Sequence, residues 1–262
     1  MLRAFSTAAT GMTAQQMIVD AISNNLANIN TVGYKRTQMD FQDLMYVKYS
    51  EAGRDTANGT QAPTGLEIGS GVRPNSTMKV YTQGEMENTG RDLDLAIEGD
   101  GFFQVTANGQ VRYTRDGSIR TNSQGQLVTS SGYTLDPAIT IPANARSISV
   151  GKDGTVMAFV GANTSGTVVG TVSLVRFANP SGLSNEGGNL LAESSASGTP
   201  TTGVAGLDGM GMIQGGFLER SNVQMVTELV NLITAQRAYE TNSRAIKAGD
   251  DMLTTANRLI AQ

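Results

Sequence analysis

Apolar residues near the N-terminus recur with the spacing of an α-helix. Residues 1–29 contain no proline and a single glycine, and their apolar positions form two seven-residue series set three positions apart. Gln15 is the polar exception in the second series. This 3-4 spacing is the a/d pattern of a coiled coil, so it predicts a terminal helix with a coiled-coil-like seam. The first series consists of Phe5, Met12, Val19 and Leu26.

The C-terminal part of the chain repeats this pattern over a longer stretch. Apolar residues recur at every seventh position, while the positions three or four away are mostly polar. A helix over residues 221–260 would be roughly 60 Å long at about 1.5 Å per residue, too long for a compact single domain. We therefore expect it to pack against something extended. Its seam consists of Met225, Leu232, Tyr239, Ile246, Leu253 and Ile260.

Between the two helices the pattern changes to that of short β-strands. Residues 102–135 alternate segments rich in Val, Phe, Tyr and Leu with turns that end in glycine. The spacing of these glycines, 8, 8 and 7 residues, is typical of an antiparallel meander. Residues 50–64 and 192–209 are rich in Gly, Ser, Thr and Ala and predict loops or connectors. The turn glycines are Gly109, Gly117, Gly125 and Gly132.

These patterns predict an α+β fold with a coiled-coil-like layer of terminal helices and a β-rich middle of short antiparallel strands. Residues 1–35 and 217–262 form the expected terminal α-helical domain for assembly. Residues 36–75 and 190–216 form an extended connector and β region, and residues 76–189 form a β-rich outer domain. The ends of such a chain can meet, which suits a subunit whose termini build a shared structure.

Composition narrows the possible chemistry. The 262 residues include no His and no Cys, so the chain has no imidazole base, no thiolate nucleophile and no His- or Cys-ligated metal site. The net charge is −4 and no cluster of Lys and Arg stands out, so we do not expect nucleic-acid binding. No apolar run is long enough for membrane insertion or for a cleavable signal peptide. We expect no catalytic residue, no cofactor and no metal.

Two alternatives compete with these interpretations. Neighbouring carboxylates could serve glycosidase chemistry, but acids in glycine-rich turns are usually solvated, so catalysis is the minor interpretation. The two helices could also form one self-sufficient intramolecular hairpin. Polar seam residues and unequal helix lengths favour packing between molecules instead. The carboxylate pairs are Asp92 with Asp94, Glu98 with Asp100, and Asp250 with Asp251.

Four segments resemble the flagellar basal-body rod protein family, which includes the rod and hook axial proteins. Residues 24–35 look like the N-terminal signature of that family. Residues 95–103 and 113–118 resemble its central segments, and residues 228–240 resemble its closing helix. The segments occur in the family's order, so the resemblance is specific. The signature residues are Asn24, Asn25, Asn28, Thr31, Gly33, Tyr34 and Lys35.

Within this family the distal-rod branch is the most similar. Residues 65–74 resemble its G-L-x-I-G-x-G-V segment, and residues 46–64 correspond to its extended rod-type insertion. A proximal rod or hook-type axial subunit is the alternative. A β-rich exported adhesin or glycan-binding module is an alternative from another class, but such a protein has no use for two terminal seams.

The resemblance implies a structural subunit and not an enzyme. It implies helical polymerisation of many copies into a hollow drive shaft that transmits torque from the motor to the hook. It also implies export by the flagellar type III apparatus without a cleaved signal peptide, and a location in the basal-body rod that crosses the periplasm. The implied partners are further copies of the chain, proximal rod proteins, the hook protein, and the P-ring and L-ring proteins.

Overall fold

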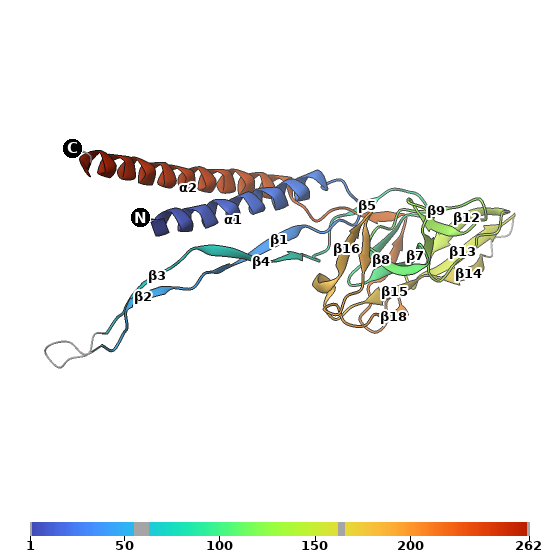
Figure 1. Ribbon diagram of the computed structural model, residues 1–262. Coiled ribbons are helices and arrows are strands. Elements are labelled where there is room, and N and C mark those ends of the chain that lie inside the picture. Colours follow the sequence, from blue (N-terminus) through green and yellow to red (C-terminus); the bar gives the residue numbers. More distant parts are fainter. Residues whose placement is uncertain (1, 55–62, 162–165, 261–262) are drawn as a thin grey trace. The chain divides into compact units, whose positions relative to one another are not determined.

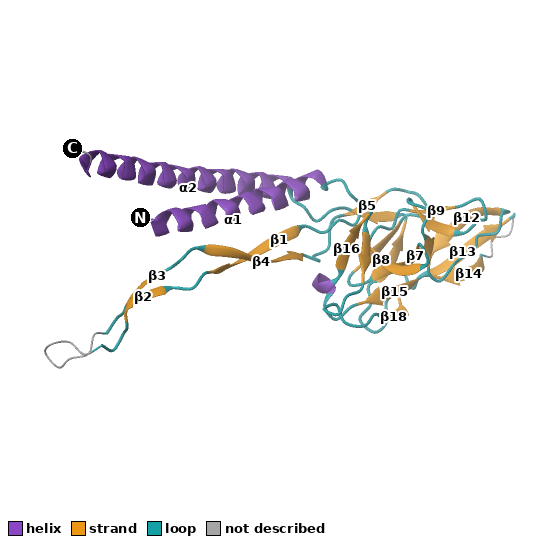
Figure 2. Ribbon diagram, viewed as in Figure 1, coloured by secondary structure: helices purple, strands orange, loops and turns teal. Residues whose placement is uncertain are grey.

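The computed structural model describes residues 2–54, 63–161 and 166–260, and the chain divides into two compact units (Figure 1). Unit 1 comprises residues 1–26, 37–78 and 225–262, so it contains both ends of the chain. Unit 2 comprises the remaining residues, 27–36 and 79–224. Figure 2 shows that the long helices and most of the β-structure occupy different parts of the chain.

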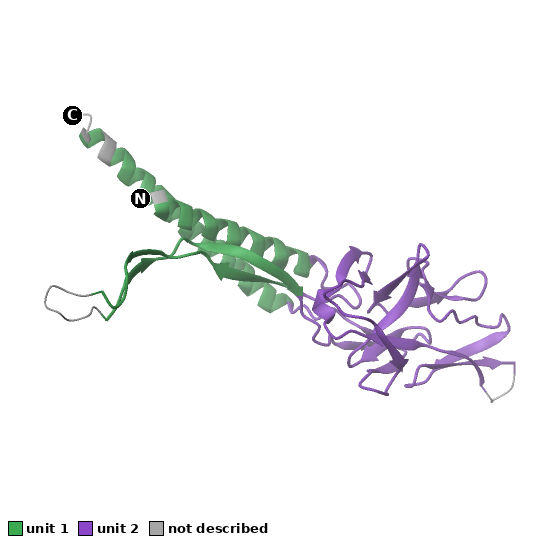
Figure 3. Ribbon diagram, turned by 60° about the horizontal axis from the view of Figure 1, so that its bottom comes forward, with its two compact units in different colours: residues 1–26, 37–78, 225–262 green, residues 27–36, 79–224 purple. Residues whose placement is uncertain are grey.

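Unit 1 contains two long helices, α1 (Leu2–Ala27) and α2 (Met225–Ile260). They lie side by side and antiparallel (Figures 1 and 3). Each has no proline and one glycine, so little interrupts the backbone hydrogen bonding. Both glycines face the other helix. A Cβ at Gly249 would come within 2.7 Å of the Phe5 ring, and one at Gly11 within 2.9 Å of Asn242 Nδ2.

The strands of unit 1 form two narrow ribbons. Strand β1 (Thr37–Asp43) pairs with β4 (Val72–Lys79), and β2 (Val47–Ser50) pairs antiparallel with β3 (Leu66–Ile68). Gly71, just before β4, has φ +114°, and a Cβ there would come within 2.2 Å of Thr10 Oγ1 on α1. The β1–β4 ribbon therefore runs close to α1 at a position that only glycine allows.

Unit 2 is built from short strands whose described pairings are antiparallel. The main sheet has nine strands, with the order β16-β17-β8-β7-β11-β10-β9, and with β15 paired to both β7 and β18. These strands are β7 (Phe102–Ala107), β8 (Gln110–Thr114), β9 (Ile119–Thr121), β10 (Leu127–Thr129), β11 (Thr134–Leu135), β15 (Ser173–Arg176), β16 (Ser184–Gly187), β17 (Leu190–Ala192) and β18 (Thr201–Val204).

Smaller sheets and one short helix complete unit 2. A three-stranded sheet has the order β12-β13-β14, and two-stranded sheets pair β19 with β6 and β20 with β5. A 3₁₀ helix, η1 (Pro180–Gly182), precedes β16. The strands are β5 (Met86–Asn88), β6 (Leu95–Glu98), β12 (Ala145–Val150), β13 (Thr155–Val160), β14 (Thr167–Thr171), β19 (Met212–Gly215) and β20 (Phe217–Glu219).

Apolar side chains of unit 2 are buried in two clusters. The larger one includes Phe103, Leu174 and Ile213, which have no exposed surface. The smaller one contains Phe102, Tyr113 and Phe177, whose rings meet edge to face with centroids 4.8 to 6.0 Å apart. Such pairs each add about 0.5–1.5 kcal/mol beyond area burial.

The meander prediction is confirmed in part. Turns join the paired strands β7 and β8, β9 and β10, and β10 and β11, but the predicted turn at Gly117 does not, because β8 pairs with β7 and β17 while β9 pairs with β10. Asn108 and Gly109, both with positive φ, form the two-residue turn between β7 and β8. The prediction that residues 192–209 are only a connector was wrong, because residues 201–204 form β18 and pair with β15. That strand is mostly exposed and consists of Thr, Gly and Val, so its composition resembles a loop while its partner β15 supplies the buried apolar residues.

The predicted fold class is confirmed in its main outline: two terminal helices enclose a sequence of short antiparallel strands. Within the part of the chain that the structure describes, neither helix has the length of apolar sequence that a membrane span requires.

Candidate assembly surface and buried charge cluster

The predicted seam residues all lie on α1 and α2 in unit 1. Most of them are half-buried, whereas Met225 and Tyr239 are exposed. The backbone of Ile260 ends α2, but its side chain lies outside the described residues. The half-buried seam residues are Phe5, Met12, Val19, Leu26, Leu232, Ile246 and Leu253.

Part of this seam is covered within one chain. The Phe5 ring packs on Gly249, and the buried small or apolar residues Ala14, Ile22 and Ala235 lie further along the two helices. A glycine at the contact lets two helices approach more closely than a larger residue would allow. An intramolecular helical hairpin, the alternative to packing between molecules, therefore accounts for some of the apolar spacing.

The most exposed apolar surface of α2 was not predicted from the sequence. Four residues at helical spacing lie on one side of its first turns, and Val226 is 74% exposed. The heptad series starts one residue earlier, at Met225, and so follows a different side of the helix. A search for i, i+3, i+4, i+7 spacing would have found this surface. We call it the α2 apolar face: Val226, Leu229, Val230 and Ile233.

The proposed insertion at residues 46–64 contains a second exposed apolar surface. Tyr46 and Tyr49 within the insertion, and Leu66 two residues after it, are more than half exposed. Arg3 Nη1 on α1 donates a hydrogen bond to the Tyr49 hydroxyl at 2.9 Å, so this part of the β2–β3 ribbon is fixed to α1. Residues 55–62 lie outside the described residues.

Several side chains of the signature, residues 24–35, form hydrogen bonds that fix the backbone at and after the end of α1. In unit 1, buried Asn25 donates from Nδ2 to Thr37 O at 2.9 Å and accepts from Thr37 N at 2.8 Å. In unit 2, Thr31 Oγ1 donates to Asn28 Oδ1 at 3.1 Å. Asn24 is exposed and Tyr34 is half-buried. The signature is thus divided between the units: its first residues, up to 26, belong to unit 1 at the end of α1, and residues 27–35 belong to unit 2.

Lys35, the last signature residue, enters a buried charge cluster in unit 2. Its Nζ lies 2.5 Å from Glu219 Oε1, and Arg115 Nε lies 2.6 Å from Glu219 Oε2. Glu219 is 1% exposed, and both cations are buried as well. We call these three residues the charge cluster. Breaking such a pair typically costs about 3–5 kcal/mol, because a charge is left buried without its partner.

Backbone carbonyl groups surround the Arg115 guanidinium. Its Nη2 donates to Ile97 O at 3.0 Å and to Gly99 O at 2.6 Å, and its Nη1 donates to Gly101 O. Three of the four segments that resemble the family, residues 24–35, 95–103 and 113–118, therefore meet at this point.

Burial and charge oppose each other in the cluster. Burial lowers the pKa of Lys35, although Glu219 acts in the opposite direction. Burial alone would raise the pKa of Glu219, but the charges and hydrogen bonds of Arg115 and Lys35 hold it below its ordinary value. The cluster therefore keeps its carboxylate ionised at neutral pH.

The structure requires a glycine at position 33 of the signature, two residues before Lys35. It has φ +67°, and a Cβ there would come within 2.7 Å of the backbone of Arg115. Its N–H donates to Glu219 O at 2.8 Å. The chain entering unit 2 thus lies against the segment that carries Arg115 and against β20.

Hydrogen bonds join three segments beside the charge cluster. At each of these segments the chain passes from one unit to the other. Val80 N donates to Arg36 O at 3.0 Å. Asn222 Oδ1 accepts from Arg36 N at 2.7 Å, and its Nδ2 donates to Val80 O at 2.8 Å. We call Arg36, Val80 and Asn222 the junction.

The carboxylate pairs considered for catalysis have structural or exposed positions. Asp94 is buried and accepts two hydrogen bonds from Arg91, while Asp92 is exposed. Glu98 and Asp100 are also exposed. Among the described residues, no three His, Cys, Asp or Glu side chains are arranged to hold a metal ion.

Comparison with known proteins gives matches at both ends and in the middle. Residues 5–35 match the family described as flagella basal body rod protein, and residues 96–158 match the flagellar hook protein FlgE/F/G D1 domain. Residues 214–259 match the flagellar basal body rod FlgEFG protein C-terminal family.

Individual relatives are similar over nearly the whole chain. The FlgG flagellar basal-body rod protein of Buchnera aphidicola subsp. Schizaphis graminum is 45% identical over 95% of this chain and 96% of its own length. That of Caulobacter vibrioides is 44% identical over 98% of this chain and 99% of its own. That of Borreliella burgdorferi is 43% identical over the full length of both. The chain therefore belongs to the FlgG family of flagellar basal-body rod proteins and is a structural subunit of the flagellar rod.

Proposed function

We propose that this subunit assembles with further copies of itself into the helical, hollow drive shaft of the distal rod, chiefly through its two terminal helices. The observation that carries the proposal is the α2 apolar face, which unit 1 leaves exposed. Full burial of a Val, Leu or Ile side chain contributes about 1.5–3 kcal/mol. Four such residues on each subunit, repeated along a polymer, favour a stiff assembly.

The division of roles follows the sequence prediction. Residues 1–35 and 217–262 act as the assembly domain, with a coiled-coil-like layer of helices from several copies. Residues 36–75 and 190–216 connect this layer to residues 76–189, which form the outer part of the rod. Proximal rod proteins, the hook protein and the P-ring and L-ring proteins are the proposed neighbours. Export by the type III apparatus, without a cleaved signal, delivers the subunit to the periplasmic part of the basal body.

The first test changes the α2 apolar face without changing unit 2. Ile233→Asp places a charge on this face, so we expect rods to be lost while purified protein keeps the unfolding transition of unit 2. Asn231→Asp adds the same charge on another side of α2, at an exposed polar position, and should assemble normally. Electron microscopy of basal bodies and urea unfolding give the two readouts. Normal rods from Ile233→Asp would remove the basis for the proposal.

A second test addresses the predicted seam. Leu232→Asp and Ile246→Asp change half-buried seam positions on the same helix. If the seam also contributes to assembly, both variants fail to form rods and unit 2 still folds. Rod formation by both variants would restrict the assembly surface to the α2 apolar face.

A third test separates the distal rod from its neighbours along the axis. Basal bodies from cells that lack this gene should have a short rod without outer rings or hook. A complete rod that lacks only its hook would move the subunit outward and favour a hook-type role. A block before the short rod forms would favour the proximal rod.

The insertion at residues 46–64 is proposed to bridge adjacent subunits and to stiffen the rod. Its exposed Tyr46 and Tyr49 support this role, because unit 1 leaves more than half of each side chain uncovered. Deletion of residues 47–63 should give curved or flexible rods. Straight rods from this deletion would mean that stiffness comes from the helices alone.

A further inference from the structure

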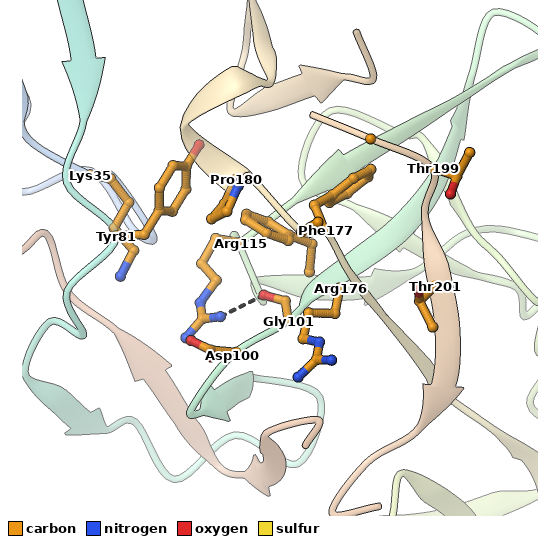
Figure 4. Close-up of a pocket in the computed structure, with 13 residues that line it drawn as sticks. Lys35, Tyr81, Asp100, Gly101, Arg115, Arg176, Phe177, Pro180, Thr199 and Thr201 are labelled. Atoms are coloured by element: carbon orange, nitrogen blue, oxygen red, sulfur yellow. Dashed lines mark hydrogen bonds between the residues drawn. The ribbon is translucent and has the colours of Figure 1, made fainter. Parts of the chain in front are cut away.

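A cavity of about 550 Å³ lies in unit 2 beside the charge cluster (Figure 4). Lys35 and Arg115 line one end of the cavity. Tyr81, Phe102, Phe177 and Pro180 form much of its apolar wall, and Phe102 and Phe177 belong to the smaller apolar cluster. The cavity therefore joins a cationic end to an aromatic wall.

The cationic end carries more positive than negative charge. Lys35 and Arg115 are both buried, and they share the single buried carboxylate of Glu219. Arg176 and Asp100, which also line the cavity and are exposed, have opposite charges and so add no net charge. A buried charge without a counter-charge is unfavourable, so this arrangement favours the entry of one anionic group.

Each of the two buried cations has more N–H groups than the hydrogen bonds it donates among the described residues. Lys35 Nζ has three N–H groups and donates two of them, to Glu219 Oε1 and to Thr82 O. Arg115 has five N–H groups and donates four of them, to Glu219 Oε2 and three carbonyl oxygens. Counted over the hydrogen bonds among the residues that the structure describes, one donor on each residue remains to bind an acceptor that enters the cavity.

The apolar wall adds a second requirement. Tyr81, Phe102 and Phe177 offer aromatic carbon along this wall. A small inorganic anion would leave this wall uncovered. A carboxylate attached to, or next to, an apolar group would use both ends of the cavity.

We propose that this cavity binds a carboxylate side chain together with an adjoining apolar side chain, and that the occupant in the rod is a neighbouring copy of this chain. The choice of occupant rests on the proposed function, because it requires copies to assemble. Charge complementarity supports it: the chain carries a net charge of −4, with 23 acidic against 19 basic side chains, so a neighbouring copy has an excess of carboxylates. The chain also offers the required combination, since Leu207 is 60% exposed and lies next to exposed Asp208.

The first experiment tests the cavity on the purified full chain and needs no assembly. 3-Phenylpropionate is titrated in an NMR experiment that follows the backbone amides of the cavity residues, with 3-phenylpropanamide as the neutral match. Because charge-assisted hydrogen bonds are about twice as strong as neutral ones, we expect the carboxylate to bind about fivefold more tightly or better. Equal affinities would overturn the charge requirement.

Two matched substitutions locate the binding. Thr199→Trp fills the rim of the cavity and should abolish binding of 3-phenylpropionate. Thr202→Trp is the control, because Thr202 is exposed on β18 but does not line the cavity. Both positions are exposed, so both variants should keep the wild-type thermal unfolding of unit 2. Undiminished binding to Thr199→Trp would place the ligand elsewhere and overturn the site.

The second experiment identifies the occupant in rods. A photocrosslinking phenylalanine derivative at position 199 should give covalent dimers of this chain in isolated basal bodies, and the same group at 202 should not. Adducts with a different protein, or no adducts at 199, would overturn the neighbouring copy as occupant. The binding assay uses monomer, so it tests the cavity independently of assembly. An Ile233→Asp variant that forms no rods but still binds 3-phenylpropionate would show that the cavity proposal and the assembly proposal can fail separately.

Discussion

The two units of this chain treat apolar residues in opposite ways. Unit 2 buries Phe103, Leu174 and Ile213 without any exposed surface and surrounds its buried charges with hydrogen bonds. In the described part of unit 1, few apolar side chains are buried, and most of the exposed large apolar residues of the chain lie there. Unit 2 therefore has a well-buried core of its own, whereas unit 1 leaves apolar surface exposed, as the proposed assembly requires.

Substitutions in the two units should also have different effects on stability and on assembly. A substitution in the core or charge cluster of unit 2 should lower the free energy of unfolding of the isolated subunit. A substitution on the α2 apolar face should leave that free energy nearly unchanged and affect assembly.

Glu219→Ala should have the largest effect on unit 2. It leaves Lys35 and Arg115 buried without their carboxylate, so we expect a loss of about 3–5 kcal/mol in the free energy of unfolding, measured by urea titration. Glu87→Ala removes an exposed partner of Arg220 at 3.6 Å and should cost at most about 1 kcal/mol. Similar losses for the two variants would mean that the charge cluster does not stabilise unit 2.

Gly33→Ala and Gly90→Ala form a pair that separates crowding from backbone strain. Both glycines have φ +67°, but a Cβ at Gly90 would meet no described atom within 4 Å, while a Cβ at Gly33 would lie 2.7 Å from the backbone of Arg115. We expect about 1 kcal/mol of destabilisation for Gly90→Ala and about 2–3 kcal/mol for Gly33→Ala. Thermal unfolding of both purified variants provides the comparison, and equal shifts would show that the close approach is unimportant.

Gly249→Leu tests whether unit 1 has internal packing of its own. The new side chain would collide with the Phe5 ring, so the two helices should separate locally at a cost of about 1–2 kcal/mol. Helical content measured by circular dichroism should fall, with unit 2 unaffected. Ala245→Leu, at an exposed position on the same helix, is the control and should retain wild-type helicity. No change in Gly249→Leu would mean that the helices do not pair in the free subunit.

Acid should weaken unit 2 through Glu219, with the smallest effect of the series. The pKa of this carboxyl is lower in the folded state than in the unfolded state, so its contribution is present at neutral pH. That contribution is lost as the pH falls below about 4.3, the usual glutamate pKa, and through the folded-state value. The effect is modest because burial opposes the two cations. Glu219→Gln should flatten this acid dependence, and an unchanged slope would assign it to other carboxylates.

The sequence was sufficient to predict both helices, because long apolar periodicity without proline leaves few alternatives. The predicted start of the second helix at residue 221 was wrong, because α2 begins at Met225. The sequence was less reliable about which side of α2 is exposed. A strict seven-residue spacing drifts by roughly 20° per heptad around a straight helix, so the series that begins at Met225 does not stay on one side. Along that series Met225 and Tyr239 are exposed, whereas Leu232, Ile246 and Leu253 are half-buried.

The charge cluster shows a different limit. Residues 24–35 and 113–118 resemble family segments, yet nothing in their spacing indicates that Lys35 and Arg115 meet. Glu219, which joins them, was missed, because a lone glutamate before a helix has no local signature and its partners are 184 and 104 positions away. Long-range pairing of this kind depends on sheet topology, which sequence periodicity does not contain.

The junction of Arg36, Val80 and Asn222 has a mechanical consequence. Three separate stretches of chain leave unit 2 at this point, and hydrogen bonds connect each of them to another. A pulling force on one stretch is therefore transmitted through these hydrogen bonds to the other two stretches. A subunit connected in this way can carry a sustained load without concentrating it on a single peptide segment.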